Sequence, residues 1–331
     1  MKKILTVLML LAVAAAALYA APRGKTSIRV GTYDVTNSFN RRSQYEKGTM
    51  PSQRMWCNSR EAVADAIIEA DCDIMGLQDV CDSVAGRREG VKPLIDIIRE
   101  RGGDFDWLVL SNKNPDFPLD GQLVNGTGII WRASRFELRD WGINWLSGIY
   151  DKPGRAKEYK YGGNNASMMW VRLYDRQAER ELIFSSAGVN GPTQYDKGQK
   201  VVYHEINVAN CRNVVNYMRY DIVPSGMPSV IALNSRNAPS HEGYKVLTGS
   251  LWFDAHDVLH EEGALSEEAI KVKDTCNNAS GEKLQGGRPD HILEDGFEVR
   301  SYMVLRMKYP TADGSLFYPS LHFPVVAELR Y

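Results

Sequence analysis

The sequence predicts an α/β fold with two packed sheets. Short segments rich in β-forming residues alternate with segments whose apolar residues recur at helical spacing along the 331 residues. No short-period repeat, low-complexity tract or proline-rich linker interrupts this alternation. We therefore expect a single domain over residues 21–331, with helices and strands around a continuous core.

The first part of the chain predicts two strands and two helices. Residues 27–35 (SIRVGTYDV) are rich in β-formers, and residues 59–70 begin with the N-cap residue Ser59 and continue at helical spacing. Residues 73–80 (DIMGLQDV) form a short apolar strand, and residues 91–101 fit a second amphipathic helix.

The rest of the chain is predicted to consist mostly of strands. Residues 127–132 and 136–146 are expected to form a strand pair, and residues 203–218 a long helix. Further strands are expected at residues 168–174, 181–189, 229–234, 291–293, 299–305 and 325–329. Long loops, which in compact domains are often functional, are expected at residues 36–56, 148–166 and 190–202.

The composition is that of an ordinary globular protein. Hydrophobic residues make up 44% of the chain and charged residues 24%, which argues against disordered, collagen-like and coiled-coil classes. The chain has 40 Lys and Arg against 41 Asp and Glu. This balance provides no general electrostatic attraction to nucleic acid.

The N-terminus has the pattern of a secretion signal. Lys2 and Lys3 precede an apolar run at residues 4–18, and small residues around Ala20 offer a cleavage site. We expect residues 1–20 to be a cleaved signal peptide and the mature protein to be periplasmic or secreted. No later segment is apolar and long enough to span a membrane.

Several motifs together carry a family resemblance. They are IRVGTYDV from Ile28, DIMGLQDV from Asp73, DGQLVNGTGIIWRASRFEL from Asp120, SVIALNSRN ending at Asn237, RPDHIL around Asp290 and SLHFPVVAEL near the C-terminus. In this order and spacing they resemble the endonuclease/exonuclease/phosphatase superfamily, which comprises metal-dependent phosphoester hydrolases. The resemblance implies a four-layer α/β sandwich, with two packed central β-sheets flanked by helices and one cleft at the strand ends.

The resemblance assigns roles to five residues. Asp79 stands where the family has a metal-binding Glu, and Asp34 where it has an Asn that contacts metal or phosphate. Both are therefore candidate ligands of Mg²⁺ or Mn²⁺. Asp290 and His322 occupy the positions of a catalytic carboxylate and imidazole pair. Asn237 matches an Asn that binds a phosphoryl oxygen, and His322 would also contact the substrate.

Three other positions depart from the family pattern. Ser235 replaces the Asp that activates water, Gly188 replaces a phosphate-binding His, and Leu321 replaces an Asp that helps to bind metal or water. Loss of a general base typically costs about 10² to 10⁴ in rate. We therefore expect a degenerate site at which hydrolysis is weak or lost. The divalent ion has also been lost if Asp79 no longer binds it.

Two other functions remain open from the sequence. In one, the chain is an active metal-dependent phosphoesterase, with Asp34 and Asp79 holding the ion and His322 acting as the base. In the other, the cleft binds a phosphorylated small molecule, lipid or nucleic acid without cleaving it. Whether the chain is an enzyme is therefore undecided at this stage. Separately, His256 and His260 are four residues apart and could form a helical metal site, although a solvated polar helix face explains them as well.

Overall fold

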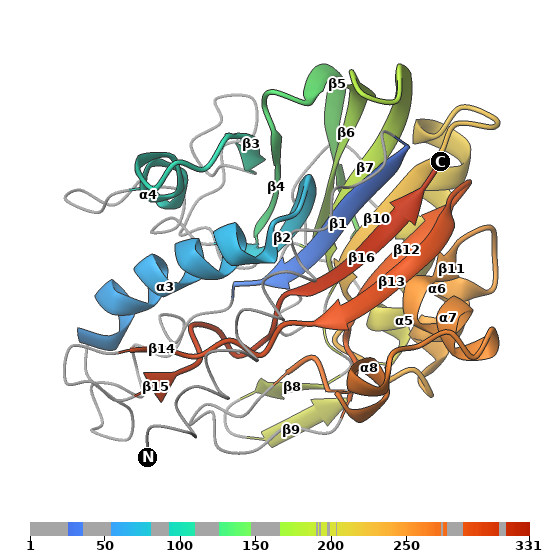
Figure 1. The fold of residues 1–331 in the computed structure, drawn as a ribbon. Coiled ribbons are helices and arrows are strands. Elements are labelled where there is room, and N and C mark those ends of the chain that lie inside the picture. Colours follow the sequence, from blue (N-terminus) through green and yellow to red (C-terminus); the bar gives the residue numbers. More distant parts are fainter. Residues whose placement is uncertain are drawn as a thin grey trace.

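Two six-stranded sheets form the centre of the molecule (Figure 1). The computed structural model describes residues 26–35, 54–80, 93–109, 126–146, 166–189, 191, 193–196, 199–202, 204–272, 274–276, 287–310 and 316–331. The predicted signal peptide and nearly all of the predicted loops at residues 36–56 and 148–166 lie outside these residues. Apolar side chains from both sheets fill the space between them, and helices cover their outer faces. The predicted fold class, an α/β sandwich with two central sheets, is confirmed.

The first sheet contains both ends of the described chain. Its strand order is β13 (Glu298–Val304), β16 (Val325–Arg330), β1 (Ser27–Asp34), β2 (Ile74–Val80), β4 (Gly126–Arg132) and β3 (Phe105–Val109). The central strands β1 and β2 are parallel, whereas the other neighbours are antiparallel. Strand β3 was not predicted, because its sequence, FDWLV, mixes an acidic residue with apolar ones over only five positions.

The second sheet repeats this plan. Its order is β11 (Phe253–Asp254), β12 (Asp290–Asp295), β10 (Ser229–Asn234), β7 (Arg180–Gly188), β6 (Ser167–Asp175) and β5 (Phe136–Trp145). Here β7 and β10 are the parallel pair. The predicted pairing of β4 with β5 is wrong, because β4 pairs with β2 and β3 while β5 pairs with β6. The tight turn between β4 and β5 instead carries the chain from one sheet to the other.

Helices complete the four layers. On the first sheet lie α3 (Arg54–Ala70) and α4 (Leu94–Glu100), and on the second lie α5 (His204–Asn216), a π-helical turn η2 (Tyr217–Ile222) and α6 (Glu242–Thr248). The short helices α7 (Ala255–Glu261) and α8 (Glu267–Lys271) contact β13.

Some boundaries differ from the prediction. Helix α3 begins before the predicted N-cap Ser59, and the predicted loop at residues 190–202 contains the hairpin β8 (Thr193–Asp196) and β9 (Gln199–Val202). A second small hairpin joins β14 (Tyr309–Pro310) to β15 (Leu316–Phe317).

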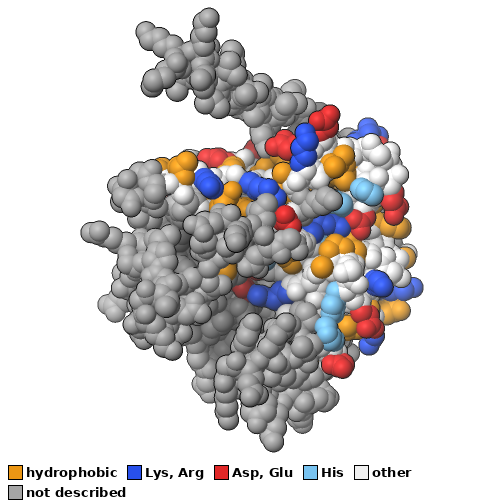
Figure 2. Space-filling model, turned by 90° about the horizontal axis from the view of Figure 1, so that it is seen from below, with side chains coloured by type: hydrophobic (Ala, Val, Ile, Leu, Met, Phe, Trp, Pro, Cys, Tyr) orange, Lys and Arg blue, Asp and Glu red, His pale blue; other side chains and the backbone are white. Residues whose placement is uncertain are grey.

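The face seen from below carries mixed charge. Acidic and basic side chains lie next to one another over its described surface, and neither sign forms a continuous patch there (Figure 2). Within the described ranges, no helix has the length and apolar character needed to cross a membrane.

The two sheets approach each other closely at Gly76. A Cβ atom on this residue would lie 2.8 Å from the Cβ of Ala232 on the opposite sheet, so only glycine fits without movement. Beside it, the buried amide of Gln78 donates across the interface to Ser186 Oγ at 3.1 Å and to Ala232 O at 3.4 Å. This buried polar side chain is thus satisfied by hydrogen bonds between the sheets.

Arg135, in the turn between β4 and β5, joins the two sheets. Its guanidinium donates to both carboxylate oxygens of Asp175 on β6, at 3.0 and 2.6 Å. It also donates to Asp73 Oδ2 at 3.0 Å and to Ser27 O at 2.9 Å, which belong to the first sheet and its approach to β2. All three charged side chains are at most 7% exposed. A buried charge set of this kind is stable only as a whole.

We expect Arg135→Ala to destabilise the protein by about 3–5 kcal/mol, because two buried carboxylates would lose their counter-charge. Urea unfolding measures the effect. Arg139→Ala is the matched control, since Arg139 pairs with Glu137 on the exposed surface and should contribute about 0–1 kcal/mol. Equal effects of the two substitutions would show that Arg135 does not hold the sheets together.

Candidate active site

The candidate site lies where strands of both sheets end. Asp34 is the last residue of β1, and Asp79 precedes the last residue of β2, its parallel neighbour. In the second sheet, Asn234 at the end of β10 is in register with Gly188 on β7 and with Asp290 on β12. Because carboxyl ends of parallel strands meet at one edge, functional side chains from distant segments gather there.

His322 and Asp290 form a hydrogen-bonded pair. His322 Nδ1 lies 2.7 Å from Asp290 Oδ2, which also accepts from Thr275 Oγ1 at 2.6 Å. Burial disfavours the charged imidazole, but Asp290 and Asp34 outweigh it and raise the pKa of His322 to about 9. The ring is therefore an imidazolium at neutral pH. The structure thus brings together the two residues that the resemblance couples.

Asp34 lies beside this pair. Its Oδ2 accepts from the side-chain amide of Asn234 across the sheet interface and is 3.8 Å from His322 Nε2. Ligand atoms of Asp34, Asp290 and His322 all lie within 4.8 Å of one another. Of the residues that the structure describes, this is the one group of three or more such side chains that could hold a metal ion.

Asp79 is paired with an arginine that the sequence analysis did not single out. Arg236 Nη2 lies 2.5 Å from Asp79 Oδ2 and 3.9 Å from Asp34 Oδ2. Asp79 mainly, helped by Asp34, raises the pKa of Arg236 above its already high value. A basic residue between the motif positions Ser235 and Asn237 was the only sequence signal for this contact.

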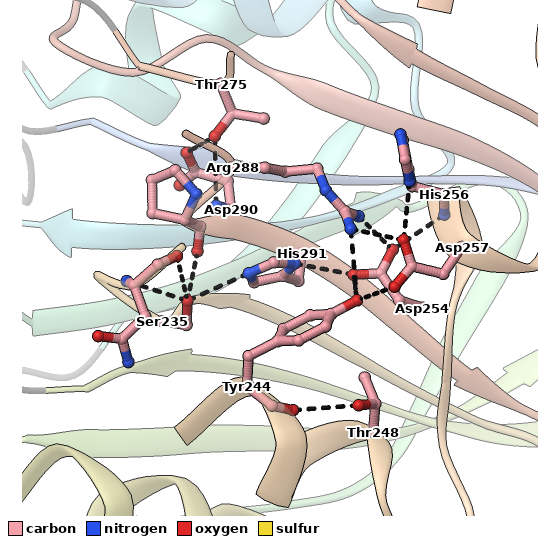
Figure 3. Close-up of polar contacts among 12 residues, drawn as sticks. Ser235, Tyr244, Thr248, Asp254, His256, Asp257, Thr275, Arg288, Asp290 and His291 are labelled. Carbon is pink, nitrogen blue, oxygen red and sulfur yellow. Dashed lines mark hydrogen bonds and ion pairs between the residues drawn. The ribbon is translucent and has the colours of Figure 1, made fainter. Parts of the chain in front are cut away.

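Ser235 is the start of a buried polar chain (Figure 3). Its Oγ lies 3.1 Å from His291 Nε2 and donates to Pro289 O at 3.0 Å. On its other side, His291 Nδ1 lies 2.8 Å from Asp254 Oδ2. Ser235, His291 and Asp254 are fully or almost fully buried. The hydroxyl at the water-activating position is therefore engaged inside the protein.

The chain continues to a second arginine. Arg288 donates to Asp254 Oδ1 at 2.7 Å and to Asp257 Oδ1 at 2.6 Å (Figure 3). Burial alone would raise the pKa of Asp254, but Arg288 and His291 hold it far below its usual range. His256, one half of the HxxxH pair, is hydrogen-bonded to Asp257 at 2.8 Å. These groups thus belong to a hydrogen-bonded network of their own, and they are not in the metal-binding group above.

The remaining predicted positions offer little to a substrate. Asn237 is buried, and its amide nitrogen donates to Asn207 Oδ1 on α5. Asn207 in turn donates to Ser235 O at 3.0 Å, so both residues fix the loop after β10. Gly188 is buried at the end of β7 and has no side chain to donate, and Leu321 presents a half-buried apolar side chain.

Comparisons of sequence gave no match: no family model and no curated protein matches the chain. Solved structures do match. An endonuclease/exonuclease/phosphatase family protein from Bacteroides thetaiotaomicron superposes with a TM-score of 0.69 at 19% identity, covering 92% of this chain and 98% of the other.

Two further structures have named activities or ligands. A mannosyl-6-phosphatase from Bacteroides thetaiotaomicron gives a TM-score of 0.68 at 18% identity, over 92% of this chain and all of the other. The catalytic domain of human Nocturnin with bound sulfate gives 0.59 at 16% identity, over 92% and 93% of the two chains. These likenesses support the resemblance seen in the sequence motifs, and they show that the chain has the endonuclease/exonuclease/phosphatase fold.

Proposed function

We propose that the protein binds a phosphorylated ligand in this cleft and that its capacity for hydrolysis is weak or lost. The observation that carries the proposal is the state of Ser235. A hydroxyl cannot take a proton from water near neutral pH, and this one is fully buried and engaged by His291 and Pro289. Gly188 and Leu321 remove two further polar groups from the same cleft.

The order Ser235, His291, Asp254 resembles a nucleophile triad, but its geometry does not suit one. A nucleophile must be reached by its substrate, whereas the Ser235 hydroxyl is buried and points to the backbone oxygen of Pro289. We therefore interpret the chain of hydrogen bonds as structural support for the loop after β10.

Binding of an anion is supported by the placement of charge in the cleft. The side chains of Arg236 and His322 are 31% and 14% exposed, while those of Asp34 and Asp290 behind them are fully buried. An approaching ligand meets the cations first. Guanidinium and imidazolium N–H groups both donate to phosphate oxygens. Because a neighbour in fold is named as a mannosyl-6-phosphatase, sugar phosphates are the first ligands to screen.

One observation favours the alternative function, an active metal-dependent phosphoesterase. Asp34, Asp290 and His322 could surround an ion, which as Mg²⁺ or Mn²⁺ would supply charge to stabilise a phosphoryl transition state. His322 would have to be neutral to act as a ligand or a base, which its raised pKa opposes. In the neutral ring, an Nδ1–H bonded to Asp290 would leave Nε2 to bind the ion or to accept a proton. Calorimetry with Mg²⁺ and Mn²⁺, with Asp34→Ala as the control, separates the two functions without assuming a substrate.

We also propose that the mature protein, a single domain over residues 21–331, acts after export to the periplasm or the exterior, following removal of residues 1–20. The apolar run after Lys2 and Lys3 supports this. Peptide sequencing of the N-terminus of the exported protein tests it.

With a chromogenic phosphodiester and Mg²⁺ or Mn²⁺, we expect turnover about 10² to 10⁴ below the rate of about 10 s⁻¹ that is typical of enzymes, because the water-activating base is missing. A spectrophotometric assay measures it, and His322→Ala identifies any rate that arises elsewhere. Ordinary enzymatic turnover that disappears in Asp79→Ala would contradict the proposed loss of hydrolysis.

Anion binding should depend on pH through His322. Because its pKa is raised to about 9, the ring is charged below that value and neutral above it. Affinity for sulfate, which remains a dianion, should be constant near neutral pH and fall as pH rises through about 9. Isothermal titration calorimetry at several pH values measures this. His322→Gln should bind more weakly and without this dependence; an unchanged pH profile in that variant would exclude His322 as the titrating group.

A further inference from the structure

Asp34 and Asp79 share one positively charged neighbour, the side chain of Arg236. They lie on the parallel strands β1 and β2, yet both face Arg236 from the opposite sheet, at 3.9 and 2.5 Å. Both carboxylates are almost completely buried. Buried carboxylates need a cation close by, and the guanidinium supplies it in every state of the protein, because arginine does not lose its proton in proteins.

The backbone on both sides of this ion pair is unusual. Asp79 has φ of +52° and Arg236 has φ of +54°, a left-handed conformation that is uncommon for residues other than glycine. At Asp79 the pairing of β2 with β4 is shifted, which marks a bulge. Bulges redirect side chains near functional sites. At Arg236 the backbone N–H is held by Asn234 Oδ1 at 2.8 Å. The local strain on each side directs the two side chains toward one another.

One oxygen atom of each carboxylate is already directed at an N–H donor. Asp79 Oδ2 accepts from Arg236, and Asp34 Oδ2 accepts from Asn234. Mg²⁺ needs oxygen ligands at about 2.0–2.1 Å in near-octahedral geometry. A divalent ion at this pair would have to displace the guanidinium or sit against its positive charge. The residues present therefore do not fit the divalent ion that the fold resemblance implies for Asp34 and Asp79.

From this disagreement we infer that Arg236 is a tethered replacement for the metal ion at the Asp34 and Asp79 pair. The inference rests on the proposed function and deepens it, because it describes a cleft that receives a phosphorylated ligand through a guanidinium rather than through a metal. A guanidinium donates hydrogen bonds to phosphate oxygens in a planar fork. It cannot coordinate and acidify a water molecule as a metal ion does. The ligand should therefore bind without any divalent ion and remain intact.

The test is to remove the tethered cation and ask whether a metal ion replaces it. Arg236→Gly removes the charge and suits the positive φ at this position. Arg236→Lys keeps a charge and is the matched control. Mn²⁺ binding is measured by electron paramagnetic resonance and by the shift in melting temperature on adding Mn²⁺. These readouts need neither ligand nor turnover, so they decide this inference even if the protein proves not to bind phosphate.

At millimolar Mn²⁺, we expect neither the wild type nor Arg236→Lys to bind the ion through Asp34. Arg236→Gly should melt at a lower temperature, bind Mn²⁺ and recover stability on adding it. This gain should vanish in Arg236→Gly combined with Asp79→Asn. Arg236→Asn, which also tolerates a positive φ, serves if the glycine variant does not fold.

Three results would overturn the inference. One is Mn²⁺ binding by the wild type that is lost in Asp34→Asn, since a metal ion would then occupy the cleft beside Arg236. Another is a folded Arg236→Gly or Arg236→Asn that gains no Mn²⁺ binding dependent on Asp79. EDTA should leave any phosphate affinity of the wild type unchanged, and a loss of that affinity would likewise overturn it.

Discussion

Compensation of buried charge where the two sheets meet is the constraint on which the rest of the structure depends. A sandwich of this kind packs apolar faces together, so any charge at the interface must find a partner from the facing sheet. Arg135 does this for Asp73 and Asp175 at one edge, and Arg236 does it for Asp79 at the strand ends. Between them, Gln78 hydrogen-bonds across the interface. The candidate site is thus one part of the same interface that joins the two sheets.

This origin of the site limits its chemistry. Asp34, Asp79 and Asp290 carry three negative charges, and Arg236 and His322 return two positive ones. Each cation is protonated and hydrogen-bonded to a carboxylate, so neither has a lone pair with which to take a proton from water. Such a site can recognise a ligand through the exposed N–H groups of Arg236 and His322 rather than through a net positive charge. It is poorly suited to stabilising new charge that develops during hydrolysis.

The sequence predicted those parts of the fold that have a strong local pattern. The buried strands β1, β2 and β10 are short runs of β-forming residues, and each was placed within one or two residues of its observed bounds. The assignment of β4 and β5 to different sheets was not predictable, because it depends on which more distant strands each one pairs with, β2 and β3 for β4 and β6 for β5. Local patterns do not contain such long-range pairings.

The difference between local patterns and long-range contacts also explains which site residues were not predicted. Asp290 and His322 could be named because the resemblance supplied their positions. Arg236 could not, because its partner Asp79 lies 157 residues away and both adopt a left-handed backbone that their residue types do not favour. The hydrogen bond between His291 and Asp254 was missed for a similar reason, since it joins neighbouring strands from positions 37 residues apart in the sequence. Departures of this kind from local preference are expected where function or strain concentrates. That Arg236 and Asp79 both depart, and meet, is therefore the strongest structural reason to place the distinctive behaviour of this protein at their ion pair.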